Sequence, residues 1–236
     1  MKKTHVAVIG AQGHFGSALC TRMKETTSNA IVSPTRDKSS NRKMAAEADV
    51  VLLTVRPDQA ENVLKEIRDV LQPEALVVSF AARYPLTSVI EITERAGARI
   101  MADLFWNMSA FVVSDKFPPE TFEGLFGNLT KTNPIQLADD KVMDAYTILL
   151  VHVLVVVLLE RLERIDNAEE HLQFLSRELS ELGGTLSIEN FRNFDLGTDP
   201  EESLKLLATP GGITEKVLRL LEETKKPEDV RKLVGE

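Results

Sequence analysis

Three glycines, Gly10, Gly13 and Gly16, recur at every third residue near the start of the chain. An apolar run precedes them at residues 6–9, and a helix-like segment follows at residues 17–24. Glycine permits a tight turn and a close approach of the backbone to a bound group, and the N–H groups at the start of a helix attract phosphate. The pattern predicts a phosphate-binding turn between a buried strand and a helix, as in folds that bind a dinucleotide.

The other residues of this turn, Gln12, His14 and Phe15, are expected to contact the same dinucleotide. We expect His14 to pack against the cofactor or to hydrogen-bond with it rather than to catalyse a reaction. The alternative interpretation of the whole stretch is a tight turn in an α/β fold that binds no nucleotide.

A polar group after the next predicted strand bears on which dinucleotide would bind. Ser33, Thr35 and Arg36 surround the place where a ribose 2′-phosphate would lie, and arginine can pair with phosphate through two hydrogen bonds. A chain that uses NAD usually has a carboxylate here, about twenty residues beyond the glycines. The group therefore favours NADP, although Asp37 follows directly and a solvated loop is the alternative interpretation.

A second glycine cluster lies near the end of the chain, before a helix-like segment at residues 215–221. Gly211 and Gly212 would expose backbone N–H groups to an anion, and Thr214 adds a hydroxyl group. The cluster is suited to a substrate carboxylate. Ordinary capping of the helix is the alternative interpretation.

Alternating strands and helices in the first part of the chain must position these groups. Strands are expected at residues 5–9, 30–32, 50–55, 76–78, 99–101 and 110–113, and helices at 15–25, 42–48, 58–71 and 85–96. The strand at 50–55 is apolar on both faces, as parallel strands are. The alternation predicts a mainly parallel, doubly wound sheet of the Rossmann type, in the α/β class.

The pattern changes after residue 138, where helices alone are expected. The first of them spans residues 139–164, and its apolar run at 146–159 is shorter than the roughly 18 to 20 residues that cross a bilayer. We interpret it as a helix buried in a core or between subunits. The expected organisation is a dinucleotide-binding domain at residues 1–138 and an all-helical domain at 139–236, through which two copies form a homodimer.

Composition narrows the class of protein further. The chain has 236 residues and a net charge of −8, yet residues 1–50 carry a net charge of +4, which suits a phosphate-rich ligand at that end. Overall acidity argues against nucleic acid as a partner. The start lacks the apolar core of a signal peptide, so we expect a cytoplasmic protein that does not enter a membrane.

The cysteine and histidine content predicts no metal site. A single cysteine, Cys20, excludes an internal disulfide framework. The four histidines show no metal-ligand spacing: His5, His14, His152 and His171. His152 is a candidate acid on the long helix, with a core histidine as the alternative interpretation.

Together these motifs resemble pyrroline-5-carboxylate reductase over nearly the whole chain. The segments that carry the resemblance are GAQGHFGSAL at 10–19, ADVVLLTVRP at 48–57, VVSFAA at 77–82, RIMADL at 99–104 and LLATPGGITEKVLRLLEE at 206–223. The last segment is the most specific, because Rossmann proteins in general lack its two glycines and threonine before a helix.

The resemblance implies an NADP-binding Rossmann domain and a helical domain that interlocks into a dimer, often within a larger ring. It implies reduction of the C=N bond of a cyclic imino acid by hydride transfer from NADPH, with a proline-type product. Further cofactor-binding residues would be Val55, Arg56, Pro57, Ala81 and Ala82. Substrate-binding residues would be Thr209, Gly211, Gly212 and Thr214, with Thr214 orienting the imine nitrogen as the catalytic residue.

The chain departs from the family pattern at three places. Arg83 replaces the glycine of an Ala-Ala-Gly stretch, and Met101-Ala102-Asp103 replaces Met-Pro-Asn. Residues 151–155 are larger than the small residues that the family has on the long helix. Two alternatives therefore stay open: an NADP oxidoreductase that acts on a different carbonyl, imine or deazaflavin, and a non-catalytic NADP-binding dimer.

Overall fold

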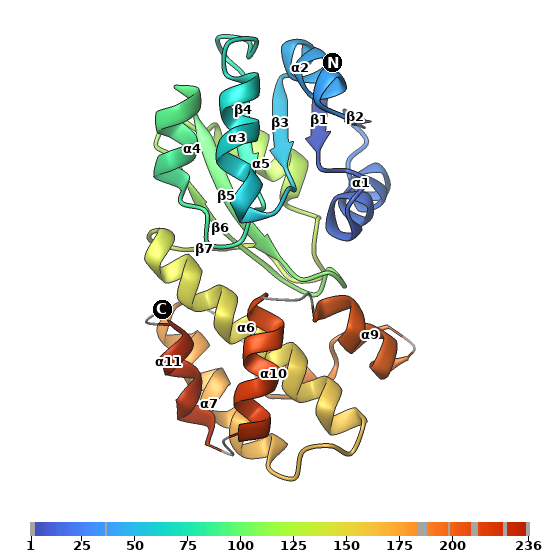
Figure 1. The fold of residues 1–236 in the computed structure, drawn as a ribbon, viewed down its shortest axis with the longest axis vertical. Helices are drawn as coiled ribbons and strands as arrows, with labels where there is room; N and C mark the ends of the chain where they lie inside the picture. The colour runs from blue at the N-terminus through green and yellow to red at the C-terminus, as the bar shows by residue number, and fades with distance from the viewer. Residues whose placement is uncertain are drawn as a thin grey trace. The chain divides into compact units, whose positions relative to one another are not determined.

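The computed structural model describes residues 3–35, 37–183, 188–197, 199–208, 212–223 and 226–234 (Figure 1). The chain divides into two compact units, Met1–Asp140 and Lys141–Glu236. The first unit contains a seven-stranded sheet with helices, and the second is built from helices.

The sheet of the first unit is mainly parallel. In chain order its strands are β1 Thr4–Ile9, β2 Ala30–Pro34, β3 Val50–Leu53, β4 Leu76–Ser79, β5 Gly97–Ala102, β6 Ser109–Val113 and β7 Ile135–Gln136. The spatial order is β2-β1-β3-β4-β5-β6-β7. Strands β1 to β5 are parallel, whereas β6 runs antiparallel to β5. The doubly wound α/β sheet predicted from the sequence is confirmed.

Strand β1 lies where the direction of winding reverses. The chain first adds β2 on one side of β1 and then returns to add β3 on the other side, with Val6 paired to both Val32 and Val50. Every residue of β3 and β4 is buried, as their β-branched apolar sequences predict. The carboxyl ends of β1 and β3 therefore flank a topological switch point, the usual place for a ligand in such sheets.

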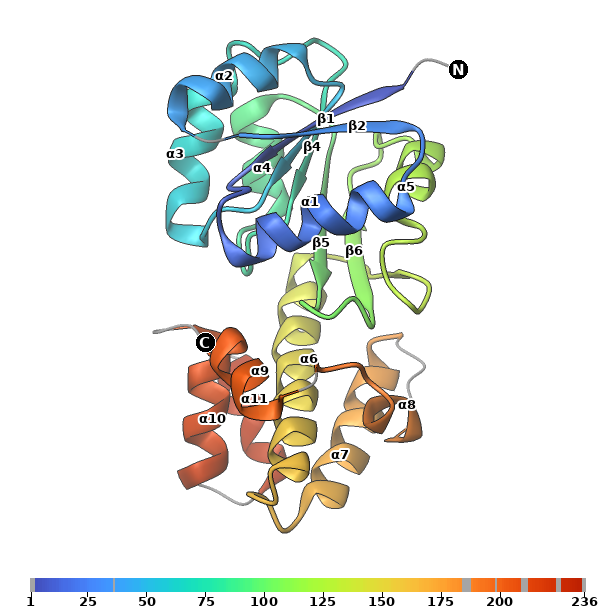
Figure 2. The ribbon, with the colours of Figure 1, turned by 90° about the vertical axis from the view of Figure 1, so that its right-hand side faces the viewer.

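Helices cover both faces of this sheet (Figure 2). They are α1 His14–Thr26, α2 Lys38–Glu47, α3 Pro57–Ile67, α4 Leu86–Thr93 and α5 Pro119–Phe126. Helices α1 and α5 share one core cluster with alternate strand residues such as Val6 and Val8. On the other face, helix α3 contacts both α2 and α4. Helix α5 and the two-residue strand β7 were not predicted from the sequence.

The regular elements described in the second unit are all helices. Its helices are α6 Asp140–Arg161, which starts at the unit boundary, α7 Ala168–Glu181, α8 Ile188–Arg192, α9 Pro200–Leu207, α10 Ile213–Glu223, η1 Pro227–Val230 and α11 Arg231–Val234. Helix α7 is followed by Gly183 at φ +91°, a left-handed conformation that suits a glycine after a helix.

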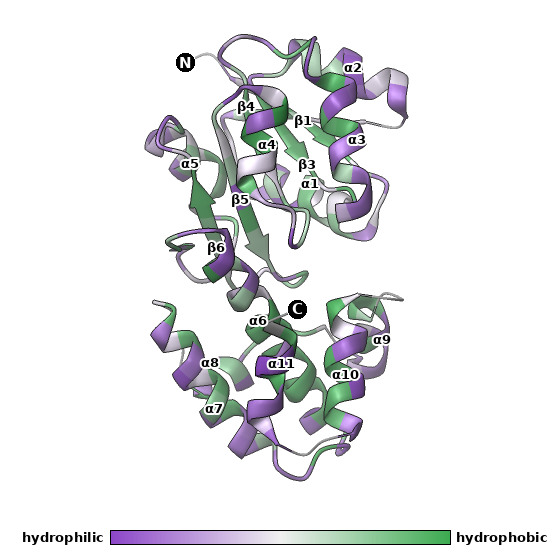
Figure 3. Ribbon diagram, turned by 60° about the vertical axis from the view of Figure 1, so that its left-hand side comes forward, coloured by the Kyte–Doolittle hydropathy of each residue, from purple (hydrophilic) through white to green (hydrophobic). Residues whose placement is uncertain are grey.

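Helix α6 is long and apolar over most of its length (Figure 3). It has 22 residues, and an 18-residue window with mean hydropathy 2.4 makes it long and apolar enough to cross a membrane by length and composition alone. The shorter apolar run at residues 146–159 therefore does not by itself decide between a membrane helix and a core helix. Within the structure 78% of that window is buried, which is the pattern of a core helix.

Candidate functional site

The glycine turn follows directly on β1, and Gly10 and Gly16 leave no room for a side chain. Gly10 has φ +91°, and a Cβ added there would lie 2.8 Å from Thr54 Oγ1. A Cβ at Gly16 would lie 2.5 Å from the same Oγ1 and 2.9 Å from Ala11 Cα. Thr54 is held in place because its Oγ1 and its N–H both donate to the Ile9 carbonyl at 2.8 Å. The two glycines therefore let β1, α1 and the end of β3 pack together.

Gly13 has a different role, because a Cβ there would meet only the Gly10 carbonyl oxygen, at 3.4 Å. Gly13 is the N-cap of α1 and supplies no side chain to bond the N–H groups of the first turn. Gln12, Gly13 and His14 are exposed. The start of α1 thus presents backbone N–H groups and the positive end of the helix dipole to solvent, an arrangement that attracts phosphate.

The structure brings the residues predicted after β3 and β4 to the same edge of the sheet as the glycine turn. Val55, Arg56 and Pro57 come directly after β3 and Thr54, and Pro57 begins α3. Ala81 and Ala82 follow β4, with Ala81 buried and Ala82 half-buried. Because β1, β3 and β4 are parallel neighbours, their carboxyl ends lie at one edge.

The end of β2 carries the residues predicted to select between NADP and NAD. Ser33 is half-buried in β2, and Thr35 is buried with its N–H donating to the Val8 carbonyl at 3.0 Å. Arg36 lies outside the described residues. The carboxylate of Asp37 accepts the N–H of Ser40 at 2.8 Å as the N-cap of α2. Asp37 is thus engaged in starting a helix.

Three aromatic side chains gather beside the glycine turn, and sequence reasoning used only Phe15. The ring centroid of Phe15 lies 5.4 Å from that of Phe80 and 5.6 Å from that of Trp106. Phe80 comes directly after β4, and Trp106 lies in the turn between β5 and β6. All three side chains are half-buried. A signal was available, since each of Phe80 and Trp106 follows a predicted strand within a few residues.

Asp103 is the hydrogen-bonding centre of the turn between β5 and β6. Its buried carboxylate accepts the N–H groups of Phe105 at 2.9 Å and Met108 at 2.8 Å, and the side-chain amide of Asn107 at 3.1 Å. Burial raises the pKa of Asp103 to about 6, although these hydrogen bonds favour the charged form. The sequence marked Asp103 only as a departure from the family pattern.

Arg83, another departure from that pattern, has φ +58°. This left-handed conformation is uncommon for a residue with a side chain and natural for glycine. The glycine that the family pattern has at this position therefore matches the backbone found here, whereas the arginine is strained.

Two of the predicted substrate residues, Gly212 and Thr214, lie at the start of α10 in the helical unit. Gly212 is half-buried just before the helix, and the buried Thr214 is its second residue. The Gly212 carbonyl accepts the N–H of Lys216 at 3.3 Å. Thr209 and Gly211 lie outside the described residues. The role of Thr214 in substrate binding and catalysis stays a prediction.

Two histidines are buried against each other in the helical unit. His152 of α6 and His171 of α7 have no exposed surface, and their ring centroids lie 5.3 Å apart. None of their ring nitrogens has a hydrogen-bond partner within the described part of the chain. Burial, and to a smaller extent the charge of His171, lowers the pKa of His152 to about 3. Such an imidazole is neutral near pH 7 and poorly suited to donate a proton, which favours the core interpretation.

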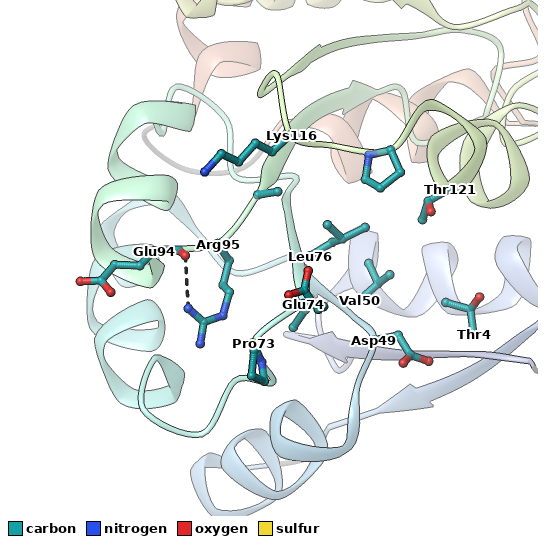
Figure 4. Close-up of a pocket in the computed structure, with 13 residues that line it drawn as sticks. Thr4, Asp49, Val50, Pro73, Glu74, Leu76, Glu94, Arg95, Lys116 and Thr121 are labelled. Carbon is teal, nitrogen blue, oxygen red and sulfur yellow. Dashed lines mark hydrogen bonds between the residues drawn. The ribbon is translucent and has the colours of Figure 1, made fainter.

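The described residues hold no group of three histidine, cysteine or acidic side chains that could bind a metal. An open hollow lies at the amino ends of the strands, beside Thr4, Val50 and Leu76, on the edge opposite the glycine turn (Figure 4). The Arg95 guanidinium at its rim donates to backbone carbonyls, among them that of Glu94 at 3.2 Å. Ligands of parallel sheets bind at the carboxyl ends, so we assign this hollow no part in the candidate site.

Comparisons with known proteins agree with the fold and the turn. Residues 5–83, less than half of the chain, match the family described as NADP oxidoreductase coenzyme F420-dependent. A search of curated proteins finds no match. The structure is similar to the NADP-bound pyrroline carboxylate reductase of Plasmodium falciparum, with TM-score 0.56 and 18% identity over 100% of this chain and 95% of that one.

Two further solved structures are similar over nearly the whole chain. A pyrroline-5-carboxylate reductase from Coxiella burnetii gives TM-score 0.51 at 18% identity, covering 99% of this chain and 94% of that one. A prephenate dehydrogenase from A. aeolicus gives TM-score 0.56 at 9% identity, covering 98% of this chain and 87% of that one. Identities this low show the fold alone. The fold and the turn place the chain in the structural class that joins a Rossmann sheet with a glycine turn to a helical unit. Within that class, its fold resembles that of the pyrroline-5-carboxylate reductases, as the sequence motifs predicted.

Proposed function

We propose that this chain binds NADP(H) at the glycine turn and uses it for hydride transfer to a small-molecule substrate. The observation that carries the proposal is the turn itself: Gly10 and Gly16 have no room for a Cβ, and the first turn of α1 has no side-chain cap. The turn lies at the switch point of the sheet, where such folds hold a pyrophosphate. The family matched by residues 5–83 and the NADP-bound Plasmodium reductase support the choice of nucleotide.

The preference for NADP over NAD rests on the end of β2. Ser33 lies near the end of β2 and Arg36 follows this strand in the sequence, where a 2′-phosphate would need donors. Asp37 is the acidic residue closest in sequence, and its carboxylate caps α2 through Ser40 instead of standing free to accept a ribose hydroxyl.

The substrate proposed is a cyclic imino acid, reduced at its C=N bond to a proline-type product. Bound NADPH would supply the hydride. The chain contributes position: backbone N–H groups at α1 hold the pyrophosphate, and the residues after β3 and β4 line the edge where the nicotinamide half would lie. The hydroxyl of Thr214 is proposed to orient the imine nitrogen, and Thr209, Gly211 and Gly212 are the other proposed substrate-binding residues.

A different small substrate is the second candidate, and residues 151–155 favour it. His152, Val153, Leu154 and Val155 are buried in α6, where the reductase pattern has small residues that leave room for ligands. A non-catalytic NADP-binding protein is the third candidate. We also propose a cytoplasmic homodimer formed through residues 139–236, as the resemblance to the reductases implies. Light scattering that shows a monomer at micromolar concentration would contradict the dimer.

Thermal stability with added nucleotides tests the binding proposal. NADPH at a hundredfold excess over its Kd is expected to stabilise the folded state by about 3 kcal/mol, and NADH by less at the same concentration. A chain that neither nucleotide stabilises would contradict the interpretation of the glycine turn. NADPH oxidation on addition of pyrroline-5-carboxylate then tests the reaction, and a panel of other imines and carbonyls separates the first candidate from the second. Stabilisation with no turnover on any of them would support the third.

A further inference from the structure

The aromatic cluster of Phe15, Phe80 and Trp106 lies on one side of the switch point. Phe15 is in the first turn of α1, Phe80 follows β4, and Trp106 follows β5. In the sheet order β4 and β5 lie beyond β3, whereas β2 with Ser33 lies on the other side of β1. A dinucleotide that crosses the switch point with its adenosine over β2 carries its nicotinamide half toward β3, β4 and β5. The cluster is therefore on the nicotinamide side.

The backbone holds Trp106 in a fixed position. Its N–H donates to the Asp103 carbonyl at 3.1 Å, and its own carbonyl accepts the N–H of Lys131 at 2.8 Å. The carboxylate of Asp103 accepts the N–H groups of Phe105 and Met108, which lie on either side of Trp106 in the sequence. Trp106 has φ +59°, a conformation that a bulky residue keeps only when its surroundings impose it. The indole is thus placed by the turn, against Phe15.

The indole of Trp106 is half-buried, so part of its surface is exposed beside Phe15, which lies in the glycine turn of the proposed pyrophosphate site. A fixed, partly exposed aromatic ring is suited to stack on a flat ring of a ligand. We propose that Trp106 is a binding residue for the nicotinamide half of NADP(H), forming with Phe15 one wall of the site. This inference rests on the proposed binding of NADP(H) at the glycine turn.

Trp106 is the single tryptophan of the chain, so its emission reports on this position alone. The experiment titrates the full chain with NADP⁺ and, separately, with 2′-phospho-ADP-ribose, which lacks the nicotinamide. The oxidised cofactor is used because NADPH absorbs where tryptophan emits and would quench at a distance. We expect NADP⁺ to quench the emission and the fragment to leave it nearly unchanged, while calorimetry shows that both bind.

Three variants test the contact. Trp106→Ala is expected to raise the Kd of NADP⁺ about two- to tenfold, the loss of one aromatic contact, and to leave the Kd of the fragment unchanged. Trp106→Phe should keep most of the affinity. Phe105→Ala is the matched control: it removes a ring from the same turn that has no ring contact in the described structure, and should change neither Kd.

The outcomes separate this inference from the proposed function. If calorimetry shows binding but NADP⁺ and the fragment change the emission equally, or Trp106→Ala weakens both ligands alike, the contact with nicotinamide is refuted and NADP(H) binding stands. If neither ligand binds to the wild-type chain, the proposed function and this inference fail together. Unchanged fragment binding in Trp106→Ala shows that the variant is folded.

Discussion

Replacing His152 by leucine tests whether the buried histidine pair weakens the helical unit in acid. His152 and His171 have no exposed surface, and no described residue is a hydrogen-bond partner of their ring nitrogens. Burial, with a smaller contribution from the charge of His171, lowers the pKa of His152 from 6.5 to about 3. Burial also lowers the pKa of His171, against the charges of Glu170 and Glu228.

The sign of the effect follows from the direction of this shift. A histidine whose pKa is lower in the folded state binds protons more readily when the chain is unfolded, so stability is present above pH 6.5 and is lost as the pH falls toward 3. With pKa values of 6.5 and about 3, His152 should lower the free energy of unfolding by about 2 kcal/mol between pH 7 and pH 5.

Leucine removes both the titration and a buried polar group without partners. The free energy of unfolding of His152→Leu is expected to exceed that of the wild type by about 1 to 3 kcal/mol at pH 7. At pH 5 this difference should be larger by about 2 kcal/mol. The pKa of Asp103, raised by burial, gives a dependence of opposite sign, but it is common to both proteins and cancels in the difference.

Urea unfolding followed by circular dichroism, at half-unit steps from pH 5 to pH 8, measures this difference. His152→Gln is the control, because it keeps a buried polar side chain but does not titrate. It should show the same pH-dependent gain over the wild type without the constant gain of leucine. A difference between wild type and His152→Leu that stays constant over this range would refute the reasoning.

Three further changes test the sheet unit. Gly16→Ala should lower the free energy of unfolding by about 1 to 3 kcal/mol, because its Cβ would lie 2.5 Å from Thr54 Oγ1, and it should weaken NADPH binding. Gly13→Ala, whose Cβ would make only a 3.4 Å contact, should lower the free energy of unfolding by less. Equal losses for the two variants in urea unfolding would contradict this packing. Arg83→Gly should raise the free energy of unfolding by about 1 kcal/mol by relieving the left-handed backbone, whereas Arg83→Ala should not; no gain for glycine would show that the arginine is unstrained. Burial raises the pKa of Asp103 to about 6, so the folded state binds this proton more tightly and stability from Asp103 falls by about 1 kcal/mol between pH 5 and pH 7. Asp103→Asn should remove that dependence. If the difference in the free energy of unfolding between Asp103→Asn and the wild type stays constant from pH 5 to pH 7, the assignment to Asp103 is contradicted.

Much of the fold was predictable because its signals are local. β-branched apolar runs predicted β3 and β4, and the change to helices after residue 138 agrees with the described elements of the second unit. Strand β7 escaped prediction because two residues are too few to show a period, whereas helix α5 was missed although helix α4, of the same length, was predicted. The antiparallel direction of β6 depends on its pairing with β5, such as Ile100 with Phe111, which no local pattern reports.

The position of the first turn is specified locally, by the residues around it. Gly10 stands where φ is +91°, and three glycines between a buried strand and a helix specify such a turn without reference to distant residues. What surrounds that turn depends on the tertiary structure. Thr54, Phe80 and Trp106 lie far apart in the sequence, and they meet the glycine turn because β3, β4 and β5 follow β1 in the sheet order and their carboxyl ends lie at the same edge. Contacts of this kind depend on how whole elements pack, and residue types and spacing within one segment do not specify them.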